Sequence, residues 1–196
     1  MLSGPLEPSN EAYALAKIAG LKMVDGFNKQ HCCDFMSVMP CNLFGVGDRY
    51  DPLYSHVIPA LIMKAHHAKI QNSADLEIWG SGAALREFMD VDDLAEVLVD
   101  ILKHYKATGP YNIGSGFEIT IKNLAELICE VVGFKGGIVF NSKKLEGTPR
   151  KILDTTRLNE LGCYSKMCQK YGGKEYFMTG LKNAYIDYLR RFFGDV

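Results

Sequence analysis

An α/β fold built around a parallel sheet is the class that this sequence predicts, and two observations predict it. Strand-like and helix-like segments alternate along most of the 196 residues, which is the chain order of a parallel sheet with crossover helices. A loop with two glycines, PCNLFGVGD at 40–48, directly follows an apolar strand-like segment. Ligands bind in such loops at the carboxyl edge of open α/β sheets, although a plain turn explains the glycines almost as well.

The first predicted helix runs from about residue 10 to residue 28. Ser9 suits its N-cap position, and Glu11 lies in the first turn, where a carboxylate complements the helix dipole. An apolar strand is predicted from Cys33 to Met39, ending at Pro40 because proline donates no ladder hydrogen bond. The apolar positions of the helix form a stripe suited to packing: Ala12, Leu15, Ala16, Ala19 and Met23.

The remaining elements follow in alternating order. Ser55 is predicted to cap a helix over about 56–69, with Pro59 tolerated in its first turn. Strands are predicted at 76–80, 85–91, 111–113 and 138–140. Asp92 and Asp93 are predicted to begin one helix, and Thr120 to cap another that ends at Gly133. A short helix around 155–161, a loop at 164–175 and an amphipathic helix over about 176–193 complete the order.

The composition is that of a globular protein without a strongly charged partner. Hydrophobic residues make up 47%, charged residues 23%, and the net charge is −1, so neither nucleic acid nor an anionic membrane is expected to bind. No apolar run approaches the roughly 18 residues of a membrane span, and residues 1–5 lack the features of a secretory signal. Six scattered cysteines without zinc spacing indicate free thiols in a reducing compartment, so a cytoplasmic location is expected.

Tyr13 and Lys17 are the pair with the clearest chemistry. Four residues apart on a helix, they share one face and lie one turn apart. A lysine ammonium stabilises a nearby phenolate, so such a tyrosine can give a proton to a carbonyl or take one from an alcohol. The three ammonium donors can also hold the hydroxyls of a ribose. The same spacing arises by chance in many helices, so the pair becomes informative only with its neighbours.

Taken together, these segments resemble the extended short-chain dehydrogenase/reductases and, within their sugar-nucleotide-modifying branch, the GDP-L-fucose synthases. The resemblance covers about residues 8–162 and resumes at the last helix. The motifs that carry it stand in family order: PSNEAYALAK at 8–17, SVMPCNLFG at 37–45, SHVIPAL at 55–61, WGSG at 79–82, REF at 86–88 with VDD at 91–93, and GTPRK at 147–151.

The resemblance implies a fold in two parts. Residues 1–48 correspond to the C-terminal part of an NAD(P)-binding Rossmann domain, with an incomplete parallel sheet. Residues 49–196 correspond to a smaller, mostly helical α/β substrate-binding lobe, with about 86–114 returning to the Rossmann domain. A homodimer that uses the first helix in a two-fold helix bundle is implied as well.

The resemblance also assigns catalytic and cofactor-binding roles. Tyr13 is implied as the proton donor for reduction of a 4-keto group, and Lys17 as the residue that holds the nicotinamide ribose. His56 is implied as the acid of an epimerisation, although a lone histidine at a helix start is more often structural. The implied cofactor is NADPH, and its nicotinamide end is expected against the following residues: Lys17, Pro40, Cys41, Asn42, Leu43 and His56.

The implied substrate is a GDP-sugar, GDP-4-keto-6-deoxymannose, which is epimerised at C3 and C5 and then reduced at C4. Arg86 is implied at the diphosphate, which a guanidinium binds bidentately, while Trp79 offers a flat face or an indole donor. Lys64 stands where arginine is usual and Glu146 where aspartate is common. With Lys151, these residues are expected to bind the substrate and, apart from Lys151, to line one groove.

One departure from the family leaves the function open. The glycine-rich loop that holds the cofactor pyrophosphate does not precede Tyr13, because 12 residues are too few for a βαβ unit. The family's epimerisation base, a cysteine, belongs to the same part. Three hypotheses remain: a part of a GDP-L-fucose synthase that is inactive alone, another reductase or epimerase of this branch, and a non-catalytic sugar-nucleotide-binding module. The absent strands predict uncovered apolar helix surface around residues 12–24.

Overall fold

A computed structural model describes residues 4–51, 54–104, 109–144, 147–161, 170 and 174–194. Its helices are α1 (Glu11–His31), α2 (Val57–Ile70), α3 (Val91–His104), α4 (Ile121–Val132), α5 (Thr156–Glu160) and α7 (Lys174–Phe193), with the 3-10 turn η1 (Pro8–Asn10) before α1. Its strands are β1 (Val38–Pro40), β2 (Asn42–Phe44), β3 (Asp75–Trp79), β4 (Leu85–Asp90), β5 (Tyr111–Ile113), β6 (Glu118–Thr120), β7 (Gly137–Asn141) and β8 (Arg150–Lys151).

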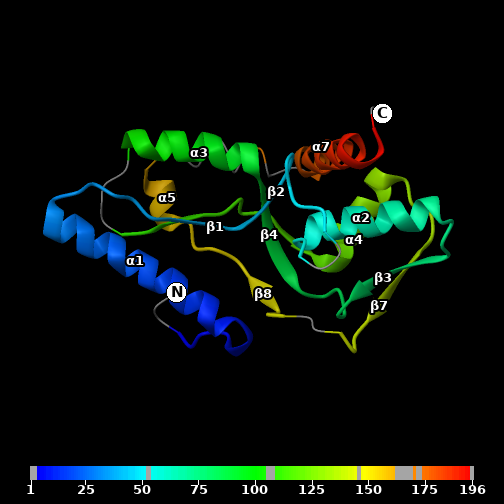
Figure 1. Ribbon diagram of the computed structural model, residues 1–196, viewed down its shortest axis with the longest axis horizontal. Helices are drawn as coiled ribbons and strands as arrows, with labels where there is room; N and C mark the ends of the chain where they lie inside the picture. Colours follow the sequence, from blue (N-terminus) through cyan, green and yellow to red (C-terminus); the bar gives the residue numbers. More distant parts are fainter. Residues whose placement is uncertain are drawn as a thin grey trace.

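Parallel pairing dominates the strands of this α/β fold. β1 pairs with β5, β2 with β4, and β3 with β7, each in parallel. β4 also pairs with β8 in parallel and with β6 in the antiparallel sense. Figure 1 shows β1, β2 and β4 through the middle of the molecule and β3 and β7 at its lower right, with α1 and α3 on opposite sides at one end and α2, α4 and α7 together at the other. The predicted α/β class and its parallel sheet are therefore confirmed.

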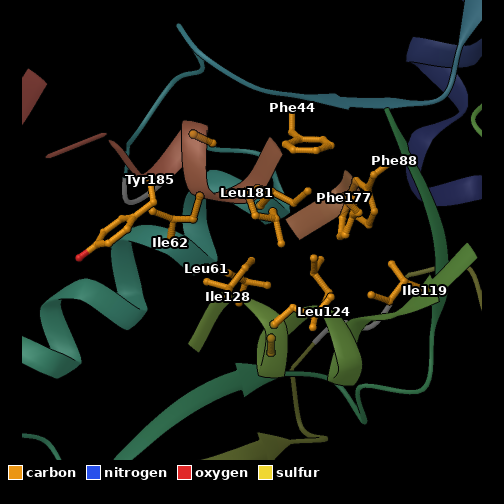
Figure 2. Packing of buried hydrophobic residues seen from close by; sticks show 14 of the residues in the cluster. Phe44, Leu61, Ile62, Phe88, Ile119, Leu124, Ile128, Phe177, Leu181 and Tyr185 are labelled. Carbon is orange, nitrogen blue, oxygen red and sulfur yellow. The ribbon is translucent and has the colours of Figure 1, made fainter. Parts of the chain in front are cut away.

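The main core lies where α2, α4 and α7 meet the ends of β2 and β4. Ile62, Leu124 and Leu181, one from each helix, have no exposed surface. Phe177 and Leu181 of α7 point towards Leu124 and Ile128 of α4 (Figure 2). Since burying one such side chain stabilises a fold by roughly 1.5–3 kcal/mol, this three-helix contact is a large source of stability.

Helix α4 begins and ends as the sequence predicts. The Thr120 Oγ1 accepts a hydrogen bond of 3.1 Å from the Asn123 backbone N–H, which otherwise has no partner in the helix. Gly133 follows the last turn with φ of 75°, a left-handed conformation that glycine adopts without strain. The local capping chemistry alone was enough to locate this element.

Two predicted caps are wrong. Asn10, rather than Ser9, occupies the N-cap of α1, because the turn η1 extends over Pro8–Asn10. His56, rather than Ser55, occupies the N-cap of α2 and makes no capping hydrogen bond with its side chain. The Ser55 hydroxyl instead donates to the Arg49 carbonyl at 2.7 Å. The turn before the helix therefore uses the serine that the sequence pattern assigned to the helix.

The predicted strand at 33–39 is mostly wrong, because residues 33–37 form neither helix nor strand and β1 begins only at Val38. Helix α1 continues to His31 and closes at Cys32, whose φ is 51°. The Asn28 side chain then accepts from the Phe35 backbone N–H at 2.9 Å and donates to its carbonyl at 2.8 Å. Because both backbone groups of Phe35 are occupied in this way, strand pairing begins only at Val38.

Helix α1 has no buried side chain along its 21 residues. Leu15 is 53% exposed and Met23 is 62% exposed. The predicted uncovered apolar surface at 12–24 is therefore confirmed. No described helix is both long enough and apolar enough to cross a membrane. α7 begins at Lys174, two residues before its predicted start, and most of the predicted loop at 164–175 lies outside the described residues.

Candidate functional site

Tyr13 and Lys17 lie together near the start of α1. The Lys17 ammonium nitrogen is 5.4 Å from the centre of the Tyr13 ring, as the four-residue spacing predicts. The Tyr13 side chain is 60% exposed, and α1 makes its most extensive contacts with the adjoining η1 rather than with a sheet. The pair is thus formed by the helix alone and is open to a ligand.

The segment Pro40–Leu43 joins the end of β1 to β2 and is firmly held. The Cys41 backbone N–H donates to the Ile113 carbonyl at 2.8 Å, and the Asn42 side-chain amide donates to the Glu87 carbonyl at 2.8 Å. Burial, followed by the charge of Glu87, raises the pKa of the Cys41 thiol to about 12. Cys41 therefore stays a neutral thiol near neutral pH and does not act as a base.

Glu87 is a buried carboxylate that the sequence analysis did not single out. It is 1% exposed and lies in the middle of β4. Its Oε1 accepts from the Gly116 backbone N–H at 2.7 Å, and its Oε2 accepts from the Leu153 backbone N–H at 3.2 Å. A Cβ at Gly114 would lie 2.4 Å from Oε1, so only glycine fits there. Burial nevertheless raises the pKa of Glu87.

The Glu87 contacts join segments that the sequence analysis treated separately. Asn42 holds the main chain of Glu87, while Glu87 holds the turn at 114–116 and the chain just after β8. The sequence carried one signal for this role, which is a carboxylate inside an otherwise apolar strand together with a Gly-Ser-Gly turn downstream. Such a carboxylate requires buried donors, and glycine-rich turns supply backbone N–H groups at close range.

Arg86 and Lys151 are brought side by side through the pairing of β4 with β8. They are register partners in this parallel pair. The Arg86 Nη1 donates to the Leu85 carbonyl at 2.7 Å. A Cβ on Gly147, which has φ of 72°, would lie 3.4 Å from the Arg86 Nη2, so the chain before β8 passes close to the guanidinium. Glu146, the fourth residue predicted for the substrate groove, lies outside the described residues.

Trp79 and Lys64 are also brought together. The Lys64 ammonium nitrogen is 4.9 Å from the Trp79 ring centre, although the two residues come from β3 and α2. Burial lowers the pKa of Lys64, while the nearby Glu77 carboxylate opposes this effect. Trp79 is 55% exposed, so its ring presents a surface to solvent. A second lysine, Lys144, lies 5.4 Å from the same ring centre.

His56 lies exposed at the start of α2, with extended backbone angles. The structure therefore arranges the predicted residues in separate groups: Tyr13 with Lys17, Asn42 with the strand that carries Arg86 and its neighbour Lys151, and Lys64 with Trp79.

A small cavity of about 150 Å³ lies elsewhere, between the ends of β2 and β4 and helix α7. It is lined by Phe44, Asp90, Asp92, Tyr176, Phe177, Thr179, Gly180 and Asn183. The single groove predicted for Trp79, Arg86, Lys64 and Glu146 stays a prediction.

The first 114 residues carry most of these groups, from α1 to β5. Residues 1–114 match the family described as the NAD dependent epimerase/dehydratase family. The chain belongs to this family. Membership agrees with the parallel strand pairs and with the placement of a tyrosine and a lysine on one exposed helical face.

Several relatives of this chain are named as GDP-L-fucose synthases. The chain is 51% identical over 184 residues to GDP-L-fucose synthase from Sinorhizobium fredii, which covers 94% of this chain and 59% of the relative. It is 49% identical over 184 residues to probable GDP-L-fucose synthase 1 from Oryza sativa subsp. japonica, covering 94% and 56%. The crystal structure of a GDP-L-fucose synthetase from Naegleria fowleri bound to NADP matches with a TM-score of 0.86 and 28% identity, covering 99% of this chain and 60% of that one. The chain thus spans less than two thirds of the length of these relatives.

Proposed function

We propose that this chain is the part of a GDP-L-fucose synthase that binds the sugar nucleotide and transfers protons. The observation that carries the proposal is the exposed Tyr13–Lys17 pair, in a chain 51% identical over 184 residues to a GDP-L-fucose synthase. The reaction is the epimerisation of GDP-4-keto-6-deoxymannose at C3 and C5, followed by reduction of the 4-keto group. The product is GDP-L-fucose.

Tyr13 donates the proton that the carbonyl oxygen needs during reduction. The ammonium of Lys17 lies close enough to the ring to stabilise the phenolate left behind. Proton transfer by a positioned group of this kind accelerates a reaction by typically 10²–10⁴-fold. His56 serves as the acid that returns a proton to the sugar during epimerisation, and its exposure at the start of α2 leaves it accessible.

The residues present fit the nicotinamide end of NADPH. Lys17 is exposed and carries three donors for ribose hydroxyls. The segment Pro40, Cys41, Asn42 and Leu43 begins at the carboxyl end of the parallel pair β1–β5, where ligands of open α/β sheets bind. When bound, NADPH supplies the hydride for the reduction. Hydrogen bonds fix the Cys41 backbone and the Asn42 side chain, so this segment offers the nicotinamide end of the cofactor a well-positioned surface.

The GDP-sugar is bound by cationic and aromatic side chains of β3, β4, β8 and α2. Arg86 binds the diphosphate, since a guanidinium offers two parallel donors to phosphate oxygens. Trp79 offers an exposed ring, with the Lys64 ammonium beside it. Lys151, the register partner of Arg86, adds a further positive charge. Glu146 completes the proposed substrate-binding set.

The proposal includes two lobes, a homodimer and a cytoplasmic location. Residues 1–48 belong to the dinucleotide domain and 49–196 to the substrate lobe. The return of 86–114 to the first lobe is supported by the pairing of β1 with β5 and β2 with β4. The uncovered surface of α1 supports a helix-bundle dimer. The free thiols of Cys32 and Cys33 suit a reducing compartment.

The decisive experiment compares the 196-residue chain with a chimera that adds the N-terminal part of the Sinorhizobium fredii enzyme. Loss of NADPH absorbance is followed after addition of GDP-4-keto-6-deoxymannose. We expect no turnover by the chain alone, because hydride transfer needs the nicotinamide held within about 3–3.5 Å of the reacting carbon. We expect turnover by the chimera, and Tyr13→Phe in the chimera is expected to impair reduction more than epimerisation. Turnover by the chain alone, or a folded but inactive chimera, contradicts the proposal.

A non-catalytic sugar-nucleotide-binding module is the second candidate. The absence of any fully buried side chain on the Tyr13 helix favours it, because the proton-transfer pair lies on an element with little tertiary packing. This candidate predicts GDP binding by the chain and no turnover by the chimera. A reductase or epimerase for another sugar nucleotide is distinguished by the product, which chromatography against GDP-L-fucose identifies.

A further inference from the structure

A hydrogen-bonded turn after β7 carries a lysine back towards Trp79. The parallel pairing of β3 and β7 places Asn141 opposite Trp79. The Lys144 backbone N–H then donates to the Asn141 carbonyl at 3.1 Å, and the Lys143 backbone N–H donates to the Asn141 side-chain oxygen at 3.2 Å. The Asn141 amide also donates to the Glu77 carboxylate at 3.3 Å. Asn141, at the end of β7, therefore positions Lys144 through the hydrogen bonds of this turn.

Two ammonium groups converge on one exposed indole. The nitrogens of Lys64 and Lys144 lie 4.9 and 5.4 Å from the centre of the Trp79 ring. The two lysines carry like charges, and Glu77 is the nearby carboxylate that acts on Lys64. Trp79 is 55% exposed, so this arrangement is not a way of burying a core residue. A flat aromatic surface with two cations matches a planar base that carries phosphate groups.

We propose that Lys144 is a further substrate-binding residue, which holds a phosphate of a nucleoside diphosphate whose base stacks on Trp79. This inference rests on the proposed function of the chain as a sugar-nucleotide enzyme. Base–aromatic stacking needs only a ring face and so suits an exposed tryptophan. An ammonium on a flexible four-carbon stem can leave the ring and reach a phosphate oxygen. Charge-assisted hydrogen bonds to phosphate are stronger than neutral ones.

Lys143 provides the matched comparison. It precedes Lys144 in the same turn, carries the same charge and is also exposed. The cation–aromatic contact with Trp79 is made by Lys144. Removing either lysine changes the net charge equally, so long-range electrostatics affects both variants alike. A difference between the two variants therefore measures local contact with the ligand.

The single tryptophan of this chain makes the test direct. Trp79 is the only tryptophan in the 196 residues, so tryptophan emission, excited at a wavelength where tyrosine absorbs little, reports on this site alone. GDP is titrated into the full chain and into Lys144→Ala and Lys143→Ala, with guanosine as the phosphate-free probe. We expect GDP to quench the emission and Lys144→Ala to raise the GDP Kd by roughly 3- to 10-fold. Lys143→Ala is expected to leave this Kd unchanged, and Lys144→Ala to leave guanosine binding unchanged.

The outcomes separate this inference from the proposed function. If Lys144→Ala and Lys143→Ala have the same GDP Kd, whether unchanged or raised, the role of Lys144 is overturned while the nucleotide site stays in place. A loss of guanosine binding in Lys144→Ala shows damage to the stacking surface and also overturns the phosphate contact. Absence of any GDP response in folded wild-type chain, with circular dichroism as the control for folding, overturns the proposed GDP-sugar site as well.

Discussion

The His66 side chain is buried in helix α2 beside the aromatic side chains of α7. Its Nδ1 lies 3.0 Å from the Tyr185 hydroxyl, and its ring centre lies 4.5 Å from that of Phe193. The Nε2 atom is buried and has no hydrogen-bond partner among the described residues. Burial, helped by the charges of His67 and Lys69, lowers the pKa of His66. The folded protein therefore holds this histidine in its neutral form.

This arrangement predicts an acid-sensitive fold. Below about pH 6.5 His66 binds a proton in the unfolded chain but stays neutral in the folded chain. The free energy of unfolding therefore falls as the pH decreases through this value. Urea unfolding at pH 7.5 and pH 5.5 measures the difference. His66→Phe, which keeps the aromatic packing, is expected to reduce the pH dependence. His31→Gln, at an exposed position at the end of α1 far from His66 in sequence, is the control and is expected to preserve it. Equal pH dependence in the wild type and His66→Phe would show that His66 is not responsible.

At the site, sequence reasoning found residues more readily than the contacts that position them. The Tyr13–Lys17 pair follows from helix geometry alone, so its spacing predicted the contact that the structure has. The resemblance predicted Lys64 and Trp79 in one groove with Arg86 and Glu146, and the structure brings the side chains of Lys64 and Trp79 together. Glu87 was missed because its partners, Gly116 and Leu153, are distant in sequence and their backbone N–H groups leave no pattern in side-chain chemistry.

Among the elements, α4 offers the clearest test of capping. Thr120 caps this helix through its side chain, whereas Thr155, at the N-cap of α5, makes no such bond. We expect Thr120→Ala to lower the free energy of unfolding by about 1 kcal/mol. Thr155→Ala is expected to change it by less than about 0.5 kcal/mol. Urea unfolding gives both values, and an equal loss in the two variants would argue against the cap.

The predicted elements differ from the observed ones mainly where a side chain competes with the backbone pattern. Thr120 and Gly133 are local signals, and both boundaries of α4 were predicted correctly. The apolar run at 33–39 indicated a strand, but Asn28 pairs with both backbone groups of Phe35. Ser55 indicated a cap, but its hydroxyl is used by Arg49. These competing bonds join positions six or seven residues apart, which periodicity does not register.

For the molecule as a whole, the uncovered surface of α1 predicts self-association. Contiguous exposed apolar patches are rare in monomers, and α1 presents Leu15, Met23 and Phe27, each about half exposed or more. We expect the chain to form dimers or larger species in light scattering at high concentration. Met23→Lys is expected to shift the distribution towards monomer. Val99→Lys, at an exposed position of α3, is the control, and a monomeric wild type at high concentration would contradict this account.

The lack of buried side chains on α1 also concerns the local stability of the proposed proton-transfer pair. Elements with few buried apolar contacts open at a much lower free energy than the global unfolding of a protein. Since Tyr13 and Lys17 reside on such an element, their mutual geometry can fray while the core of α2, α4 and α7 stays intact. A partner that covers α1 must offset the free-energy cost of ordering this helix when it binds. The apparent affinity of that partner is lowered by this cost. If α1 forms the proposed dimer contact and Tyr13 and Lys17 transfer protons as proposed, assembly and activity are thermodynamically linked through this one helix.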